Sequence, residues 1–453
     1  MNAHFSNQND PFALTRRDFL RLAALSTAGV LSGCAINPVT GKSQLMLVSE
    51  ETEIAMDKSN SPHQFSSDYG PIQESALNGY VQGVGKKLAA GTHRPHMPYQ
   101  FQVVNATYVN AYAFPGGSIA ATRGILLSLD NEAELAALLG HELGHVNARH
   151  TAEQMSKTML AQSVVGGLGV YAANQGTLYG QLASQLGILG TGALLASYSR
   201  DNERQADALG MEYMVKSGYG SDGAVGLMEM LKEMSKGKTH GSTDLLFATH
   251  PMSDERYQTA INRAQETYAA AKKLPLHKER YMDHTASLRA IGGAIKSMQL
   301  GDEAMGQQKY AEAETHFQKA LGLTPNDYAG LCMMAKCQLA QKKDSSALDY
   351  AEKAKAIYPG EAQALHLSGF AKIRTKKFES ALEDFKACEK RFPGNPNTAF
   401  YSGYAWEGMG RRDTAAIAYR DFLKAVNQGP QAEHAYRRLV EWGYIDQKSP
   451  SSK

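Results

Sequence analysis

The feature that most constrains the fold is a period of 34 residues in the C-terminal third of the chain. Alanine occupies four positions at this spacing. Proline occupies three positions at the same spacing in a second register, and an aromatic residue or alanine occupies four positions in a third. Three registers at one period are hard to obtain by chance, so the region is predicted to be a stack of repeated units, each contacting only its neighbours. The recurring positions are Pro325, Pro359 and Pro393; Ala313, Ala347, Ala381 and Ala415; and Phe317, Ala351, Phe385 and Tyr419.

This region resembles the tetratricopeptide repeat. The resemblance implies two antiparallel helices per repeat, with small residues where the helices cross and proline just after the second helix. About four repeats run from Gly301 to Val426, and Ala432 to Tyr444 is predicted to be a capping helix in which Trp442 covers the end of the core. Such arrays bind peptides or proteins on a concave surface and carry no chemistry of their own.

The chemistry is expected at His141-Glu142-Leu143-Gly144-His145, an H-E-x-x-H pattern that is a zinc site only if it lies on a helix. Asn131 can cap that helix, with Glu134 three residues later as its capping-box partner. Apolar residues then recur at helical spacing between Leu135 and Val146. A helix is therefore predicted from Asn131 through the motif.

On a helix, His141 and His145 project from nearly the same side, one turn apart, where two imidazoles can hold one Zn²⁺. Glu142 lies about 100° round the helix from His141. It can border the metal without binding it, as a general base acting on a zinc-bound water requires. Gly140 and Gly144 each cost a helix about 1 kcal/mol relative to alanine, so another part of the chain is expected to approach this turn closely.

A catalytic zinc needs a third protein ligand and an open position. His150 and Glu153 are candidates, but the metzincin spacing is not met. Glu203 is the better candidate, because Glu203 and Asp207 are four residues apart on one face of a predicted second helix. Asp207 would then fix a ligand histidine by accepting its other N–H. The alternative is that both acids belong to an ordinary solvated helix face.

Together these residues carry a family resemblance. H-E-L-G-H, followed by S-R-x-x-E-x-x-A-D at 199–207 and by Thr249-His250-Pro251 with Arg256, resembles the HtpX/CAAX-protease class of gluzincin metallopeptidases. The resemblance covers roughly Asn37 to Arg263. It implies one zinc ion per chain and a zincin-like metallopeptidase domain. The roles it implies are zinc ligand for His141, His145 and Glu203, general base for Glu142, and partner of a ligand histidine for Asp207.

His250 stands in the family's H-P motif and is expected to act in one of two ways, or to be a structural histidine. It would either be a fourth ligand that latches the resting enzyme or stabilise the tetrahedral intermediate.

The remaining pattern of the N-terminal half predicts helices at 49–59 and 75–90 and strands at 99–104 and 111–127. Pro115 and the two glycines after it interrupt the second strand. We expect residues Gly116 to Ala121 to form an edge strand to which a peptide substrate adds, or else a simple hairpin turn.

The first 33 residues are predicted to be an export signal. Thr15 to Arg21 contains the twin arginines of a Tat signal, and Leu31-Ser32-Gly33-Cys34 resembles a lipobox. Cleavage before Cys34 and acylation of its thiol would leave a lipoprotein anchored at the cell envelope. Ile36, two residues past the cysteine, favours the outer membrane. The alternative is an uncleaved N-terminal anchor.

The charge composition argues against a nucleic-acid-binding protein. The net charge of +2 over 453 residues, with no strong basic run, gives no support to nucleic-acid binding. Cys332, Cys337 and Cys388 have no disulfide or metal spacing and are expected to be small core residues.

Residues 162–199 contain no charged residue. They are predicted to be a helical hairpin packed on the catalytic helix, with a lid or a membrane-apposed hairpin as the alternative.

The sequence therefore predicts an α+β, mainly α, protein in which a zincin-like domain precedes an α-solenoid. The domains are expected at 1–33 (signal), 34–270 (metallopeptidase), 271–300 (linker) and 301–446 (repeats). This pairing resembles the BepA-type periplasmic proteases, although the twin-arginine signal and lipobox depart from that type.

The predicted function is zinc-dependent cleavage, at the periplasmic face of the envelope, of misfolded or stalled envelope proteins that the array recruits. The alternative is a chaperone or assembly factor for outer-membrane proteins whose protease site is mostly latched. In either case the array is a candidate site for the outer-membrane assembly machinery.

Overall fold

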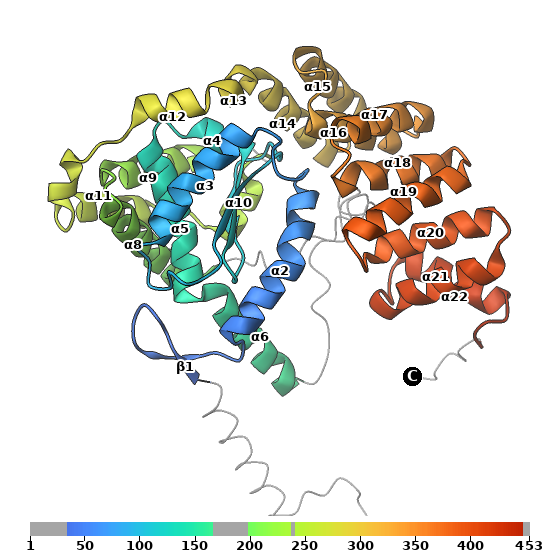
Figure 1. Ribbon diagram of the computed structural model, residues 1–453, viewed down its shortest axis with the longest axis horizontal. Coiled ribbons are helices and arrows are strands. Elements are labelled where there is room, and N and C mark those ends of the chain that lie inside the picture. The colour runs from blue at the N-terminus through green and yellow to red at the C-terminus, as the bar shows by residue number, and fades with distance from the viewer. Residues whose placement is uncertain (1–33, 166–197, 237–240, 447–453) are drawn as a thin grey trace, which may run out of the picture.

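The computed structural model describes residues 34–165, 198–236 and 241–446. Helices dominate both halves, and a small sheet lies in the N-terminal half (Figure 1). The predicted mainly α fold, in which a domain with a small sheet precedes a helical array, is confirmed. The signal at 1–33 and most of the uncharged stretch, residues 166–197, lie outside the described residues, as does any structure predicted for them. Within the described ranges no helix combines the length and apolar character that crossing a bilayer requires.

The larger sheet has three strands in the order β3-β5-β4. These are β3 Gln100–Val104, β4 Ala111–Ala113 and β5 Ser118–Thr122. Strand β5 pairs with β3 in parallel and with β4 antiparallel, so it is the central strand. The prediction of a substrate-binding edge at Gly116 to Ala121 is therefore wrong, because both sides of that strand are already paired. The alternative, a hairpin turn, is confirmed, and β4 is an edge of the sheet.

The strand predicted at 111–127 is also too long. It is divided into β4, β5 and the short helix α4 Arg123–Ser128. Thr122 ends the strand and begins the helix, since its Oγ1 accepts a hydrogen bond from the Ile125 amide at 3.3 Å. The apolar run could not distinguish a buried strand from a buried helical turn.

The helices of the N-terminal half surround this sheet. The helix predicted at 49–59 continues to Ser67 through Pro62, while the helix predicted at 75–90 is confirmed. The helices are α2 Glu50–Ser67, α3 Ser75–Ala89, α5 Glu132–Ala148, α6 His150–Val165, α8 Arg200–Lys216, α9 Asp222–Lys236, α10 Asp244–Thr249 and α11 Asp254–Gln265. A separate two-stranded sheet pairs β1 Cys34–Ile36 with β2 Ser43–Leu45.

Short helices follow and pack against the N-terminal half. They are η1 Ala269–Lys273, α12 Lys278–His284 and α13 Ala286–Ala290. The Tyr281 hydroxyl donates to the Leu126 carbonyl at 2.7 Å, and the Ala133 amide donates to the Leu276 carbonyl at 3.1 Å. The stretch between the two predicted domains is thus largely helical and attached to the first.

The array contains four antiparallel helix pairs and a final helix, as the 34-residue period predicts. They are α14 Gly292–Gly306, α15 Tyr310–Leu323, α16 Tyr328–Ala340, α17 Asp344–Ile357, α18 Ala362–Arg374, α19 Phe378–Arg391, α20 Pro396–Gly408, α21 Arg412–Ala425 and α22 Pro430–Glu441. The first pair begins at Gly292, before the predicted Gly301. Trp442 stacks on Tyr419 at the end of the core, and the three cysteines of the array are buried and free, as predicted.

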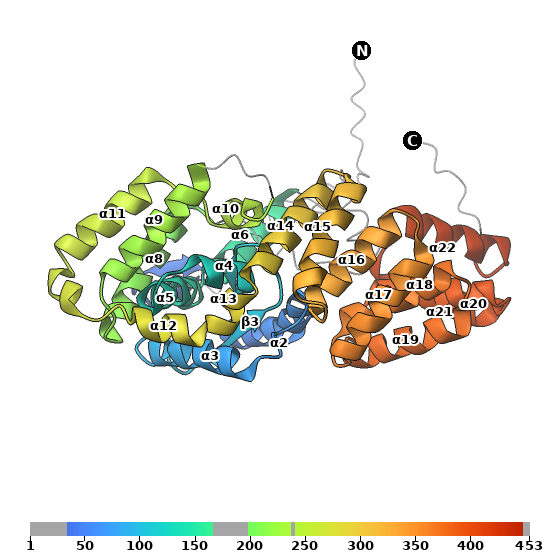
Figure 2. The same cartoon turned by 90° about the horizontal axis from the view of Figure 1, so that it is seen from above.

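The array contacts the N-terminal half through buried polar groups, and both views show the two parts side by side (Figures 1 and 2). Arg123, at the start of α4, pairs with Asp327 in front of α16 at 2.6 Å, with both side chains buried. Lys336 Nζ donates to the Tyr69 hydroxyl at 3.0 Å. Gln363 Nε2 donates to the Ser66 carbonyl at 3.2 Å. The array is therefore held against the turn that ends α2.

Candidate metal centre

Helix α5 presents the H-E-x-x-H motif, and its start forms as predicted. Asn131 Oδ1 accepts from the Glu134 amide at 3.0 Å. The Glu134 carboxylate does not accept from the Asn131 backbone N–H, as a capping box would require; it accepts from Asn131 Nδ2 at 2.7 Å and from the Asp130 backbone amide at 2.6 Å. Every residue of α5 is buried, so the motif lies in the interior of the domain and not on its surface.

The two glycines of the motif region let α8 approach α5 closely. A side chain at Gly140 would meet the Gly210 carbonyl oxygen at 2.8 Å, and one at Gly144 would meet Ala206 Cα at 2.9 Å. The expectation of a close approach at this turn is confirmed, and the approaching segment is the backbone of α8. The contact brings the side chain of Glu203 to the two histidines.

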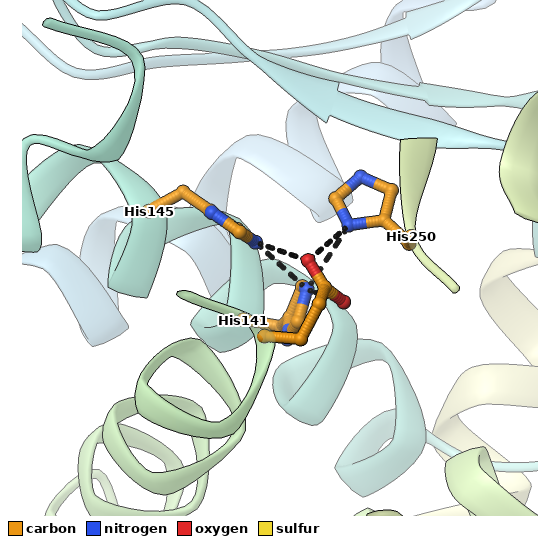
Figure 3. Close-up of side chains that lie close together, drawn as sticks. His141, His145 and His250 are labelled. Atoms are coloured by element: carbon orange, nitrogen blue, oxygen red, sulfur yellow. Dashed lines mark hydrogen bonds and ion pairs between the residues drawn. The ribbon is translucent and has the colours of Figure 1, made fainter. Parts of the chain in front are cut away.

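Four donor groups converge between these helices (Figure 3). His141, His145, Glu203 and His250 are all buried, and one donor atom from each lies within 4.8 Å of the other three. The Nε2 atoms of His141 and His145 are 3.1 Å apart, and His145 Nε2 is 3.3 Å from Glu203 Oε1. His250, directly after α10, places Nδ1 3.1 Å from the same carboxylate oxygen.

Asp207 and Arg256 support the cluster from the α8 side. His141 Nδ1 lies 2.9 Å from Asp207 Oδ1, as predicted for the residue that orients a ligand histidine. Arg256 donates to both oxygens of Asp207 and lies 2.8 Å from Glu203 Oε2. Burial would raise the pKa of Glu203, but the charges of His250 and His141 hold that pKa well below its usual value. The carboxylate is therefore ionised, as a metal ligand must be.

His150 and Tyr198 support the cluster from the other side. His150 Nδ1 lies 3.0 Å from His145 Nδ1, and the Tyr198 ring stacks on the His145 ring with centroids 3.8 Å apart. His150 thus contacts the ring nitrogen that faces away from the cluster, and it is not the third donor. Burial holds the pKa of His145 well below its usual value, which favours the neutral imidazole that binds metals. Glu153, the other candidate, pairs with Lys157.

Glu142 borders the cluster without joining it. Its Oε1 is 3.9 Å from His250 Nε2, and its buried Oε2 has no hydrogen-bond partner among the described residues. Burial raises the pKa of Glu142, an effect that the nearby positive charges of His250 and His141 only partly offset. A carboxylate with a free, buried oxygen and a raised pKa is suited to accept and return a proton.

The donor set fits Zn²⁺. Two imidazole nitrogens and a carboxylate oxygen are the ligands that catalytic zinc takes, and they leave the fourth position of a tetrahedron open. In the described structure His250 stands where it could occupy that position. The Nε2 atoms of His141 and His145 are 3.1 Å apart, and the ionised Glu203 carboxylate lies between them and His250. The donor atoms are therefore already arranged for a metal before it binds.

The residues given a role in the predicted site lie together in the structure, apart from Cys34; they are His141, Glu142, His145, Glu203, Asp207 and His250. Cys34 lies apart from them on β1. Two supporting residues were not foreseen in any role: Arg256, noted only as part of a motif, and Tyr198. No local signal identifies Tyr198, which lies near the end of the uncharged stretch and reaches His145 only through the tertiary fold.

Comparison with known proteins gives two matching family models. The model described as Peptidase family M48 matches residues 75–264, and the one described as Tetratricopeptide repeat matches residues 298–362. The metal cluster lies wholly within the first match.

The proteins that this chain is similar to include two assembly-enhancing proteases and a metalloprotease. The beta-barrel assembly-enhancing protease of Yersinia pestis is 29% identical over 248 residues, 54% of this chain and 50% of that protein. Its namesake in Escherichia coli K12 is 25% identical over 60% of each chain. Metalloprotease YcaL of Escherichia coli K12 is 32% identical over 46% of this chain and 75% of that protein. The chain thus spans only about half to three-fifths of the length of the two assembly-enhancing proteases.

Proposed function

Because this chain belongs to peptidase family M48, a family of zinc-dependent metallopeptidases, we propose that it is a zinc endopeptidase anchored by a lipid at the bacterial cell envelope. Its substrates in this proposal are misfolded or stalled envelope proteins, recruited by the repeat array. The observation that carries the catalytic part is the convergence of His141, His145 and Glu203 beside the unpartnered carboxylate oxygen of Glu142.

The chemistry follows from the positions of these groups. Zn²⁺ held by His141, His145 and Glu203 would supply a Lewis acid that polarises a peptide carbonyl and acidifies water. Glu142 accepts the proton of the attacking water and returns it to the nitrogen of the leaving amine. Asp207 and Arg256 keep His141 and Glu203 in place during this cycle.

Substrate binding is assigned to strand β4. It is an edge of the sheet, and it lies against α5. An extended peptide can add to such an edge through main-chain hydrogen bonds, which gives affinity without demanding a particular sequence. A protease for unfolded proteins needs this kind of tolerance.

The proposed substrates and the proposed location are supported by different observations. The beta-barrel assembly-enhancing proteases are named for outer-membrane assembly, and tetratricopeptide arrays bind proteins. The twin-arginine and lipobox residues of the first 34 positions support export and acylation of Cys34. We therefore assign the enzyme to the periplasmic face of the envelope, with the outer membrane favoured by Ile36.

A second candidate function is a chaperone or assembly factor whose protease site is mostly latched. The position of His250 favours it, because a fourth protein donor in the cluster would fill the place that substrate and water need. A purely structural zinc site is disfavoured, since it would need no buried Glu142 carboxylate with an unpartnered oxygen beside the metal.

The deciding experiment incubates the acyl-free protein from Ala35 onward, loaded with one zinc, with unfolded casein. A Glu142→Gln variant with the same zinc content serves as the control. Digestion by the parent alone would establish the peptidase and its base together. Zinc bound in both proteins with no digestion by either would contradict the protease and favour the latched chaperone.

A further inference from the structure

The chain immediately after Cys34 is fixed to the end of the catalytic helix. Asn37 Nδ2 donates to the Ala148 carbonyl, the last of α5, at 3.3 Å and to Gln44 Oε1 at 2.8 Å. Its Oδ1 accepts from the amides of Val39 and Thr40, which closes the turn between β1 and β2. One buried asparagine thus joins the first hairpin to the helix that carries the metal-site histidines.

A second set of contacts fixes the segment after the hairpin. The Leu47 amide donates to Ser156 Oγ on α6 at 2.8 Å. Arg149, the residue that ends α5, donates to the Val48 carbonyl at 2.8 Å. The side chains of Met46 and Val48 pack on Ala152 in a small buried core. In Figure 1 this hairpin lies at one end of the domain, beside α6. The segment after Cys34 is therefore fixed to the domain and is not a flexible linker.

These attachments limit the distance between Cys34 and the metal cluster. Cys34 precedes Asn37 by three residues, a span of at most about 11 Å. Ala148 follows His145 by three residues, about 5 Å along the helix. With the Asn37 side chain between them, Cys34 lies within roughly 25 Å of His145.

The hairpin and the segment directly after it also expose apolar side chains near Cys34. Ile36 is 70% exposed and Leu47 is 45% exposed, although Met46 and Val48 beside them are buried. Lys42 is exposed at the turn between the strands. Exposed apolar side chains next to a cation suit the boundary of an anionic bilayer, where the apolar groups leave water and the cation meets the headgroups.

We propose that the β1–β2 hairpin and the segment directly after it form a membrane-docking surface, in which Ile36 and Leu47 enter the bilayer interface beside the acylated Cys34. The proposal rests on the lipid anchor proposed above and deepens it. The hairpin adds a second point of attachment beside the lipid. The metal centre is then held within roughly 25 Å of the lipid, so the substrates are polypeptide segments at or near the membrane surface.

A fluorescent probe at the hairpin tests the docking without using protease activity. Leu47→Cys and Ile36→Cys variants of the acylated chain are labelled with an environment-sensitive dye and bound to phosphatidylethanolamine/phosphatidylglycerol vesicles. The three other cysteines of the mature chain are buried and the Cys34 thiol is acylated, so labelling is selective. Ile417→Cys on α21, 60% exposed, is the matched control.

We expect a blue shift, and quenching by headgroup-level nitroxide lipids, at positions 36 and 47 only. The protein could float with the vesicles while the dye at position 47 reports an environment as polar as that at position 417. That result would overturn the docking and leave the anchor intact. A shift that appears only at high protein density would overturn it in favour of a second copy of the chain. Failure of Cys34 to be acylated would overturn the anchor and the docking together.

A linker insertion tests the limit on reach. About ten Gly/Ser residues are inserted between Cys34 and Ala35 in a chain that also carries Ile36→Ser and Leu47→Ser, which remove the docking side chains, and the insertion adds roughly 16–19 Å of average span. Lipid-tethered unfolded substrates then present the cleavable segment at increasing heights above the vesicle. The parent is expected to lose cleavage at heights that the insertion variant still reaches, while both digest soluble casein equally. Equal height profiles for the two would contradict a fixed position.

Discussion

Asp207 Oδ1 lies 2.9 Å from Nδ1 of His141, and the same carboxylate accepts two hydrogen bonds from Arg256. Burial would raise the pKa of Asp207, but Arg256 and His141 lower it, so the carboxylate remains ionised. An ionised acceptor fixes the imidazole with Nε2 directed at the metal cluster. The zinc site therefore depends on a residue that does not bind zinc.

Replacing Asp207 should weaken zinc binding. In Asp207→Asn the amide can no longer serve Arg256 and His141 as an anionic acceptor, and we expect a loss of about 10- to 100-fold in zinc affinity. Chelator competition measures the affinity directly. Asp201→Asn, on an exposed residue of the same helix, is the control and should bind zinc like the parent. Equal affinity for the parent and Asp207→Asn would show that Asp207 does not position His141.

The close contact between α5 and α8 predicts the effect of a single methyl group. Gly144→Ala places Cβ 2.9 Å from Ala206 Cα, so the helices must separate and Glu203 must move from the histidines. We expect a loss of about 1–3 kcal/mol in the free energy of unfolding, together with weaker zinc binding. Denaturant titration measures the first and chelator competition the second.

Gly83→Ala is the matched control for that substitution. Gly83 is an exposed helical glycine on α3, and a side chain there meets nothing within 4 Å. Alanine should stabilise this helix by about 0.5–1 kcal/mol. If Gly144→Ala were as stable as Gly83→Ala and bound zinc as tightly as the parent, the close helix contact would not set the metal geometry.

His250 should restrain the protease if it is a latch. His250→Ala removes the fourth donor and leaves His141, His145 and Glu203 to hold the metal, so digestion of unfolded casein should rise. The measurement is the initial rate at equal zinc content, with X-ray absorption to count the nitrogen ligands. A lower rate with unchanged metal geometry would instead indicate that His250 stabilises the transition state.

Lys336 should make the stability of the protein depend on alkaline pH. Burial lowers its pKa to about 8, and its hydrogen-bond partners are the neutral Tyr69 and Gln363. Below pH 8 both the folded and unfolded states carry the proton, and the folded state bears the full cost of burying the charge. Between about pH 8 and 10.5 the folded state has released it while the unfolded state retains it, so stability rises with pH, by on the order of 3 kcal/mol.

A Lys336→Met variant isolates this effect from the other groups that titrate in alkali. Methionine fills similar space without a charge, so the variant should be more stable than the parent at pH 7. Its advantage should shrink as the pH rises through 8 towards 10. Denaturant titrations of both proteins across this range measure the difference. An advantage that stays constant with pH would exclude a buried charged lysine.

The sequence by itself determined the features that depend on near neighbours along the chain. Asn131 and the apolar spacing that follows fix α5, and the H-E-x-x-H spacing then places His141 and His145 on one side of it. The 34-residue period likewise predicts the helix pairs of the array, because each repeat packs mainly on the next. In these cases the hydrogen bonds and packing that decide the structure lie within one or two helical turns, or within one repeat.

Only the tertiary structure decided what meets the motif. The position of β5 at the centre of its sheet follows from its pairing with β3, about 18 residues earlier, which an apolar run cannot reveal. Tyr198 and His250 reach the cluster, and Arg256 supports it, because α8 packs on α5 while α11 brings Arg256 to Glu203 and Asp207 of α8. Their burial and electrostatic environment are properties of that packing, since a buried carboxylate owes its charge to partners far away in the sequence.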